Sequence, residues 1–174
     1  AASDVYKRQH PMELVMKEFA EEQLPEMTEI WNDVVEEGIS FPGDKALSEK
    51  EALKMFREQA STVCAMLNGE VVGVYILHPN NFGRCGHIAN ASYAVRKDCR
   101  GEGIGRKMVR HCLENAREKG FRGLQFNAVV ATNQAAIHLY ESLGFHKIGT
   151  IKDGYHLKNG SYEDIHIFYY YLGE

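Results

Sequence analysis

The chain has 174 residues, of which 44% are hydrophobic and 25% are charged, so its composition is that of an ordinary soluble globular protein with one substantial core. The net charge of -4 and the pI near 6.1 argue against a nucleic-acid partner, because nucleic-acid binders carry an excess of Lys and Arg. No apolar run approaches membrane-spanning length, no secretory signal is evident, and four scattered cysteines fit a reduced, cytoplasmic setting.

The first residues look foreign to the rest of the chain. The stretch from Asp4 to Gln9, D-V-Y-K-R-Q, resembles a translated transposon end of the type used to prepare sequencing libraries. We therefore treat residues 1–9 as a non-native N-terminal artefact and expect residues 10–174 to form a single domain.

The first part of the chain predicts a strand and two helices. Residues 12–19 are expected to form the strand. Apolar residues at helical spacing then predict a helix over residues 24–35, with Pro25 near its start and Gly38 after its end. A capping box, S-E-K-E, begins at Ser48 and opens a second helix that runs to about residue 60.

The remaining elements alternate between strands and helices. A tight type I′ turn is favoured at Asn68-Gly69 because both of its central residues must adopt positive φ angles. We expect strands at 62–67, 71–77, 87–95, 123–130, 145–152 and 162–172, a helix from about residue 104 to Lys119, and a helix that begins at Asn133.

The turn between the strand at 87–95 and the following helix contains three glycines. Glycines let a backbone approach a ligand closely, and the first amides of a helix have no partners within it, so the turn suits a phosphate group. Several amides that donate to a charged oxygen, at about 1.5–3 kcal/mol each, outweigh the helix dipole at about 0.3–1 kcal/mol. The spacing fits neither the dinucleotide fingerprint nor a Walker A loop; it fits R-x-x-G-x-G, from Arg100 to Gly105.

A second motif lies one strand further along. Residues 133–145 read N-Q-A-A-I-H-L-Y-E-S-L-G-F and match N-x-x-A-x-x-x-Y-x-x-x-G-F. With both motifs in this order, residues 13–172 resemble the GCN5-related N-acetyltransferase (GNAT) family. The resemblance implies a single N-acetyltransferase domain with the α/β (α+β) GNAT fold: a mixed central sheet of about seven strands, splayed in the middle and flanked by about four helices.

The same resemblance implies acetyl-CoA as cosubstrate and no metal. Pantetheine would lie between the strands at 87–95 and 123–130, and main-chain groups of the turn would hold the pyrophosphate. Asn133 is also a good N-cap, a role compatible with a cofactor contact. Basic side chains at Arg96, Lys97, Arg100 and Arg106 either attract the phosphates or are solvated surface. The implied cofactor-binding residues are Tyr93, Ala94, Val95, Arg100, Gly101, Glu102, Gly103, Ile104, Gly105, Arg106, Asn133 and Ala136.

Tyr140 is the implied catalytic residue, near the cofactor sulfur; a core tyrosine is the alternative. Full proton transfer from a phenol with a pKa near 10 to a thiolate with a pKa near 8.5 is uphill by ~2 kcal/mol. We therefore expect Tyr140 to stabilise the thiolate by a hydrogen bond, with the proton coming from the acylated ammonium. Glu36, Glu37 and Asp164 could act as the base through water, and the sequence does not decide between them.

The acceptor residues are expected to be Asn90, Asn127 and Phe41. Asparagine is uncommon inside a buried strand, so the two asparagines either satisfy each other or present amides to a small zwitterion. Phe41 lies in a loop with an exposed-looking aromatic, in a region that borders the acceptor site in the family, although it could simply anchor that loop. The tail at 154–164 resembles phosphinothricin-type acetyltransferases. Residues 78–84 and 87–90, together with Phe126-Asn127, resemble yeast acetyltransferases that act on azetidine-carboxylate and proline analogues.

The expected activity is acetyl transfer from acetyl-CoA to the primary or secondary amine of a small amino-acid-like acceptor, by direct attack in a ternary complex. The alternatives are a protein N-terminal acetyltransferase of the ribosomal-protein type and a non-enzymatic acyl-CoA sensor, which would keep the glycine turn without needing Tyr140. A small-molecule amine is the expected partner, and a homodimer is left open.

Overall fold

The chain follows the predicted order of strands and helices in a computed structural model that describes residues 13–173. The N-terminal segment assigned as an artefact, and the predicted start of the first strand at residue 12, lie outside the described residues. The elements are β1 (Leu14–Glu18), α2 (Leu24–Glu37), α3 (Glu49–Arg57), β2 (Ser61–Leu67), β3 (Glu70–Pro79), β4 (Ile88–Val95), α4 (Ile104–Glu118), β5 (Gly123–Val130), α5 (Gln134–Ser142), β6 (His146–His156) and β7 (Tyr162–Tyr171), with short 3₁₀ turns η1 (Glu21–Gln23), η2 (Gly83–Cys85) and η3 (Lys97–Cys99).

Local sequence signals set most of these boundaries. The left-handed Gly38 (φ 65°) ends α2, and Ser48 caps α3 by accepting from the Glu51 amide at 3.1 Å. Asn68 and Gly69 both have positive φ angles, as the β2–β3 turn was predicted to require. Several predicted bounds were inexact: α2 continues to Glu37, α3 ends at Arg57 rather than near residue 60, β3 spans Glu70–Pro79, and β6 continues to His156.

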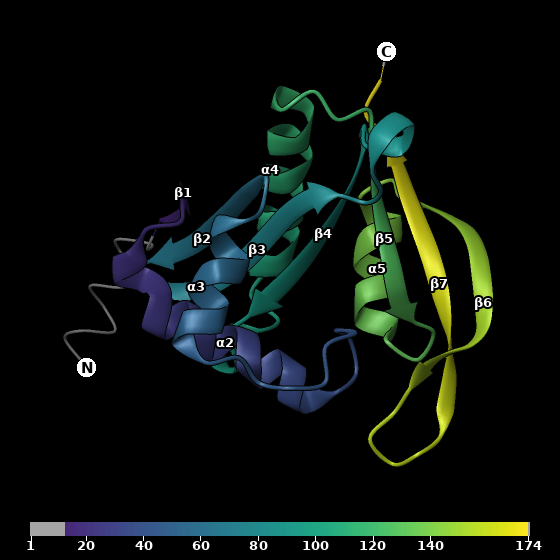
Figure 1. Cartoon of the computed structure of the whole chain (residues 1–174), viewed down its shortest axis with the longest axis horizontal. Coiled ribbons are helices and arrows are strands. Elements are labelled where there is room, and N and C mark those ends of the chain that lie inside the picture. The colour runs from purple at the N-terminus through teal and green to yellow at the C-terminus, as the bar shows by residue number, and fades with distance from the viewer. Residues whose placement is uncertain (1–12, 174) are drawn as a thin grey trace.

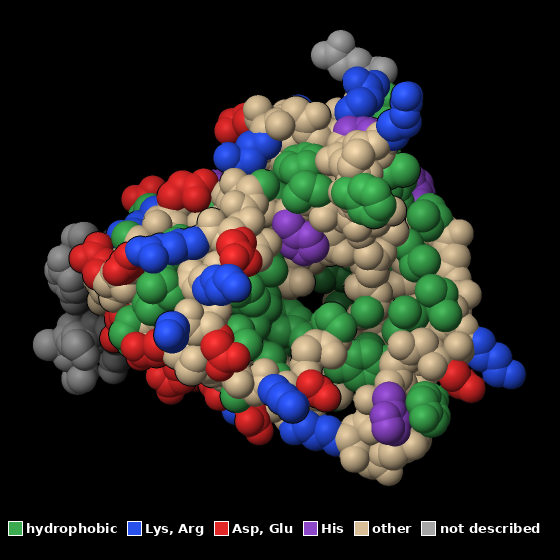
Figure 2. Space-filling model, in the orientation of Figure 1, with side chains coloured by type: hydrophobic (Ala, Val, Ile, Leu, Met, Phe, Trp, Pro, Cys, Tyr) green, Lys and Arg blue, Asp and Glu red, His purple; other side chains and the backbone are tan. Residues whose placement is uncertain are grey.

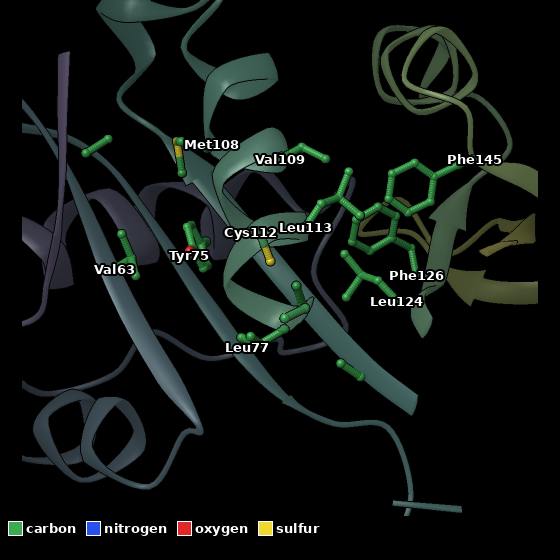
Figure 3. Packing of buried hydrophobic residues seen from close by; sticks show 14 of the residues in the cluster. Val63, Tyr75, Leu77, Met108, Val109, Cys112, Leu113, Leu124, Phe126 and Phe145 are labelled. Atoms are coloured by element: carbon green, nitrogen blue, oxygen red, sulfur yellow. The ribbon is translucent and has the colours of Figure 1, made fainter. Parts of the chain in front are cut away.

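The seven strands form one mixed sheet in the order β1-β2-β3-β4-β5-β7-β6, which confirms the predicted GNAT architecture (Figure 1). Helices α2 and α3 cover one face of its β1–β4 half, whereas α4 and α5 lie on the opposite face. Alternate strand residues therefore enter different cores. Tyr75 belongs to the same buried cluster as Met108 and Phe126 on the α4 side (Figure 3), whereas Val74 belongs to the cluster of Trp31 and Phe56 on the α2 side.

Phe41 belongs to the α2-side core, so the expectation that its ring is exposed was wrong. The residue is only 8% exposed, and its ring lies 4.4 Å from that of Trp31. Its carbonyl oxygen also accepts a 2.7 Å hydrogen bond from the Tyr155 hydroxyl, which joins the α2–α3 loop to β6. A loop aromatic next to Pro42 looked solvent-facing because the sequence does not show that Trp31 offers it a stacking partner.

The sheet is splayed at its centre, as expected. Strands β4 and β5 are parallel, and their pairing is limited to Ile88–Asn90 of β4 and Gly123–Gln125 of β5. Beyond this point β5 bulges, since its register with β7 shifts between Phe126 and Val129, and Ala128 adopts a positive φ of 63°. Within residues 13–173, no helix is long and apolar enough to cross a bilayer.

Candidate active site

A cleft opens where β4 and β5 separate, and Figure 2 shows it as a hollow near the centre of the molecular face, bordered by hydrophobic side chains. It holds a cavity of about 70 Å³. Strand β4 stays paired with β3 up to Val95. After Asn90, its other edge, which faces β5, has no strand partner among the described residues. The lining residues are Ser40, Phe41 and Pro42 from the α2–α3 loop, Ala91, Ser92 and Tyr93 from β4, Phe126, Asn127, Ala128 and Val129 from β5, and Asn133, Ala136 and Tyr140 at α5.

Residues 100–106, called the phosphate turn below, connect η3 to the first turn of α4. Gly101 and Gly103 have φ angles of 81° and 79°, and a Cβ atom on either would meet nothing within 4 Å. The glycines are therefore required by backbone conformation, while the space beside them is open. Ile104 is 5% exposed and anchors the turn in the core, so only its main chain can contact a ligand. The geometry fits a phosphate held by amides at the start of α4.

Three of the four basic side chains predicted around this turn are paired with carboxylates. Arg100 makes a bidentate contact with Glu37 on α2, at 2.6 and 3.0 Å, and its Nε donates to the Val95 carbonyl at 3.3 Å. Lys97 lies 3.8 Å from Asp33, and Arg96 contacts Glu70 and Asp98 at 3.2 and 2.7 Å. Arg106 donates to the Ser142 hydroxyl at 2.7 Å. Arg96, Lys97 and Arg100 are thus paired with carboxylates, whereas the described partner of Arg106 is a neutral hydroxyl. Glu102 is exposed.

Asn133 is the N-cap of α5, as predicted, and its Oδ1 accepts from the Ala136 amide at 3.2 Å. Its Nδ2 has no hydrogen bond among the described residues and lies at the cleft. The two predicted roles of Asn133 are therefore compatible: the oxygen caps the helix, and the nitrogen is free to donate to a ligand. Ala94 and Val95 do not line the cavity with their side chains, so any contact there must use the main chain of β4.

Tyr140 lies two turns along α5 and packs its ring against Phe126, with centroids 4.4 Å apart. Burial of the ring raises the pKa of Tyr140 well above its ordinary value, which favours the neutral phenol. The raised pKa makes full proton donation from Tyr140 to a thiolate harder and supports a hydrogen-bonding role for its hydroxyl. Tyr93 lines the same cleft, and its buried hydroxyl has no partner among the described residues.

The two predicted acceptor asparagines do not contact each other directly. Asn90 is half-buried and Asn127, at the bulge of β5, is exposed, so the expectation that both lie inside a buried strand was wrong for Asn127. Both donate their Nδ2 atoms to Oδ1 of Asn80, Asn90 at 3.1 Å, and Asn127 also accepts from Gln125 Nε2 at 2.6 Å. We call Asn80, Asn90, Gln125 and Asn127 the amide cluster. Sequence reasoning missed the role of Asn80, because no local pattern places a loop residue beside two strands.

The candidate bases differ in their surroundings. Glu37 is held by Arg100, Asp164 accepts from the Asp153 amide at 2.9 Å, and Glu36 is exposed. None of the three lines the cavity, whose lining has no carboxylate or imidazole among the described residues. No described group of three or more His, Cys, Asp or Glu side chains is placed to hold a metal ion.

A glycine turn whose geometry fits a phosphate, beside a splayed parallel pair with Tyr140 at the gap, is the arrangement expected of an acetyl-CoA-dependent acyltransferase. Comparison with known families agrees, since the model of the Acetyltransferase (GNAT) family matches residues 16–145. The chain belongs to this family and is a GNAT N-acetyltransferase.

Individual relatives are similar over most of the chain. N-acetyltransferase aca1 of Schizosaccharomyces pombe is 32% identical over 170 residues, which cover 87% of this chain and 81% of the relative. The L-amino acid N-acyltransferase MnaT of Escherichia coli is 26% identical over 124 residues, covering 68% of this chain and 72% of the relative. A phosphinothricin acetyltransferase from Sinorhizobium meliloti, solved with acetyl-CoA, shares the fold with a TM-score of 0.86 and 22% identity, covering 92% of this chain and 89% of that one.

Proposed function

We propose that the protein transfers the acetyl group of acetyl-CoA to the primary or secondary amine of a small amino-acid-like acceptor, by direct attack in a ternary complex. The observation that carries this proposal is the uncharged acceptor side of the cleft. No lining side chain is a carboxylate, an ammonium or an imidazole, while the amide cluster meets the cleft through Asn127. Amides accept from an ammonium and donate to a carboxylate, so this surface suits a zwitterion without placing a fixed charge in the cleft.

The donor side is supplied mainly by main-chain groups. The amides of the phosphate turn bind the pyrophosphate, and the free edge of β4 from Tyr93 to Val95 bonds to pantetheine as a short extra strand would. Asn133 Nδ2 adds a side-chain donor. Ala136 faces the cleft with a single methyl group, which leaves room for the cofactor beside α5.

The chemistry needs one bond made and one broken. The neutral amine attacks the thioester carbonyl, the C–S bond breaks as the C–N bond forms, and Tyr140 donates a hydrogen bond to the departing sulfur. The nitrogen loses a proton and the thiolate gains one, so no net proton source is required. Since no lining carboxylate or imidazole is available among the described residues, water conducts the proton away from the amine.

A panel of acceptors tests the proposal most directly. Release of free thiol from acetyl-CoA is followed with the standard α-amino acids and imino acids, with polyamines, and with peptides that carry free N-termini. We expect turnover with at least one small amino acid and a much lower kcat/KM for polyamines and peptides. Turnover with peptides alone would replace the proposal by the N-terminal acetyltransferase alternative, and binding of acetyl-CoA without turnover of any amine would favour the sensor.

A further inference from the structure

Asn80 occupies the point where β4 and β5 begin to separate. It follows the last residue of β3, and its Oδ1 accepts hydrogen bonds from Asn90 on β4 and from Asn127 on β5. The last paired residues of the two strands are Asn90 and Gln125, so the three amides meet where the pairing ends, and Asn127 among them lines the cavity. One loop side chain therefore links β4 to β5 at this point.

The position of Asn80 is fixed by its main chain. Its amide donates to the Ile88 carbonyl at 2.8 Å, which ties the residue to the first position of β4. Its side chain is half-buried, and both acceptor sites of Oδ1 are filled by the two asparagines. The side-chain orientations of Asn90 and Asn127 thus depend on Asn80, because each directs its Nδ2 toward this single oxygen.

Some amide atoms of the cluster have hydrogen-bond partners among the described residues and others do not. The nitrogens of Asn90 and Asn127 are each committed to Asn80, so the amide oxygen of Asn90 is left without a donor among the described residues. Asn127 Oδ1 has one lone pair engaged by Gln125 and one remaining. Conversely, Asn80 Nδ2 donates to no described residue, so both of its protons are available. The cluster offers oxygens from the strands and a nitrogen from the loop.

We propose that Asn80 is a positioning and specificity-determining residue for an α-amino acid acceptor. It holds Asn90 and Asn127 so that their oxygens receive the ammonium group, and its own Nδ2 donates to the acceptor carboxylate. This inference rests on the proposed acetylation of a small amino-acid-like amine and names the group that distinguishes such an acceptor from a simple amine. All contacts are neutral in the free protein, so no buried charge is left uncompensated before the acceptor binds.

The test compares two substitutions of Asn80 with two matched acceptors. The acceptors are the most active amino acid of the panel and its carboxamide, which keeps the amine and lacks the carboxylate charge. Asn80→Ala removes both hydrogen bonds that orient the asparagines, so the KM for both acceptors should rise about tenfold while the KM for acetyl-CoA stays within about twofold. Asn80→Asp keeps an oxygen that accepts from both asparagines, but it replaces the donor by a negative charge.

Asn80→Asp should therefore restore the carboxamide KM to near the wild-type value while raising the KM of the amino acid at least as much as Asn80→Ala does. The difference between the two KM values in Asn80→Asp depends on the acceptor carboxylate. If Asn80 only linked the strands, the KM values of both acceptors would change together. Asn81→Ala is the control, because Asn81 is exposed, adjacent in sequence, and bonded only to the following loop amide at 2.8 Å. Its KM values should equal those of the wild type.

Two contrary results have different meanings. If the wild type acetylates amino acids but both Asn80 variants change the two acceptors equally, the inference about Asn80 is wrong and the proposed function stands. If the wild type acetylates no amino acid, the proposed function is wrong and the inference falls with it. Melting temperatures of all variants are measured, so that a change in KM is compared only between folded proteins.

Discussion

The phosphate turn follows the end of β4, whereas the amide cluster lies where β4 and β5 stop pairing, and the two would bind a polar ligand in different ways. At the turn, the contacts expected for the ligand come from the main chain, while the side chains of Arg96, Lys97 and Arg100 are bound to carboxylates of the protein itself. At the amide cluster, every expected contact comes from a side chain, and these side chains orient one another.

This contrast determines how each side should respond to substitution. Main-chain donors are independent of residue type as long as the backbone can adopt the required conformation, which here demands glycine at the left-handed positions. Side-chain amides can be exchanged one at a time, so the acceptor side is free to change with the substrate. Substitutions should therefore affect donor binding through backbone conformation and acceptor binding through individual groups.

The largest effect is expected from Gly103→Val. A valine at φ 79° is strained, and its side chain would enter the open space beside the turn where a phosphate is expected. Loss of two amide–phosphate hydrogen bonds, at about 1.5 kcal/mol each, weakens acetyl-CoA binding on the order of a hundredfold. Calorimetric titration with acetyl-CoA measures this change.

Gly120→Val is the matched control for this experiment. Gly120 lies just beyond the other end of α4, has φ 84°, and also has no atom within 4 Å of a built Cβ. The same backbone strain should therefore lower its melting temperature by a similar amount without changing affinity. If the two variants bind acetyl-CoA equally well, the turn does not hold the phosphates and the main-chain half of the comparison is lost.

Much of the donor side could be predicted because its determinants are local in sequence. The glycines of the phosphate turn, the cap at Asn133 and the spacing from Asn133 to Tyr140 each lie within one turn or helix, and Asn133 and Tyr140 both line the cleft. The strand order was likewise predictable, since hairpins and helical crossovers leave few arrangements.

The acceptor side was predictable only in part because its contacts join distant segments. Asn80 meets Asn127 across 47 positions, and Tyr155 meets Phe41 across 114. No periodicity or motif encodes such meetings. The bulge that exposes Asn127 is equally hidden, because it depends on how β5 pairs with β7 rather than on the residues of β5 alone.

Tyr140→Phe should have the next largest effect and should act on turnover rather than on binding. The substitution keeps the ring that packs against Phe126 and removes only the hydroxyl. Turnover is expected to fall about tenfold or more, while the affinity for acetyl-CoA stays unchanged. Steady-state kinetics and calorimetry on the same preparation separate the two quantities. Tyr170→Phe, which changes a ring packed against Phe145, is the control and should leave turnover intact.

The same residue gives a prediction for pH dependence. Burial raises the pKa of Tyr140, so the neutral, hydrogen-bond-donating phenol persists above pH 10, where a free tyrosine would lose its proton. Turnover at saturating substrates should therefore show no Tyr140-dependent fall below pH 10. A falling limb near pH 9 that disappears in Tyr140→Phe would contradict a buried neutral phenol.

The smallest effect is expected from Glu37→Gln, which tests whether side chains matter at the phosphate turn at all. The Glu37 carboxylate neutralises Arg100 and places a negative charge beside the expected phosphate site. Its loss frees Arg100, so acetyl-CoA should bind up to about fivefold more tightly, within the 0.2–1 kcal/mol typical of exposed ion pairs. Because screening by salt reduces the electrostatic contribution, the gain in affinity should shrink between 50 and 300 mM salt, roughly as the Debye length falls.

Asp33→Asn, at the neighbouring Lys97 pair, is the control for removing one negative charge from α2. Equal gains in the two variants would indicate a general charge effect. A loss of affinity in Glu37→Gln alone would show instead that the ion pair holds Arg100 in a binding position, so that a side chain takes part in what we describe as a main-chain site.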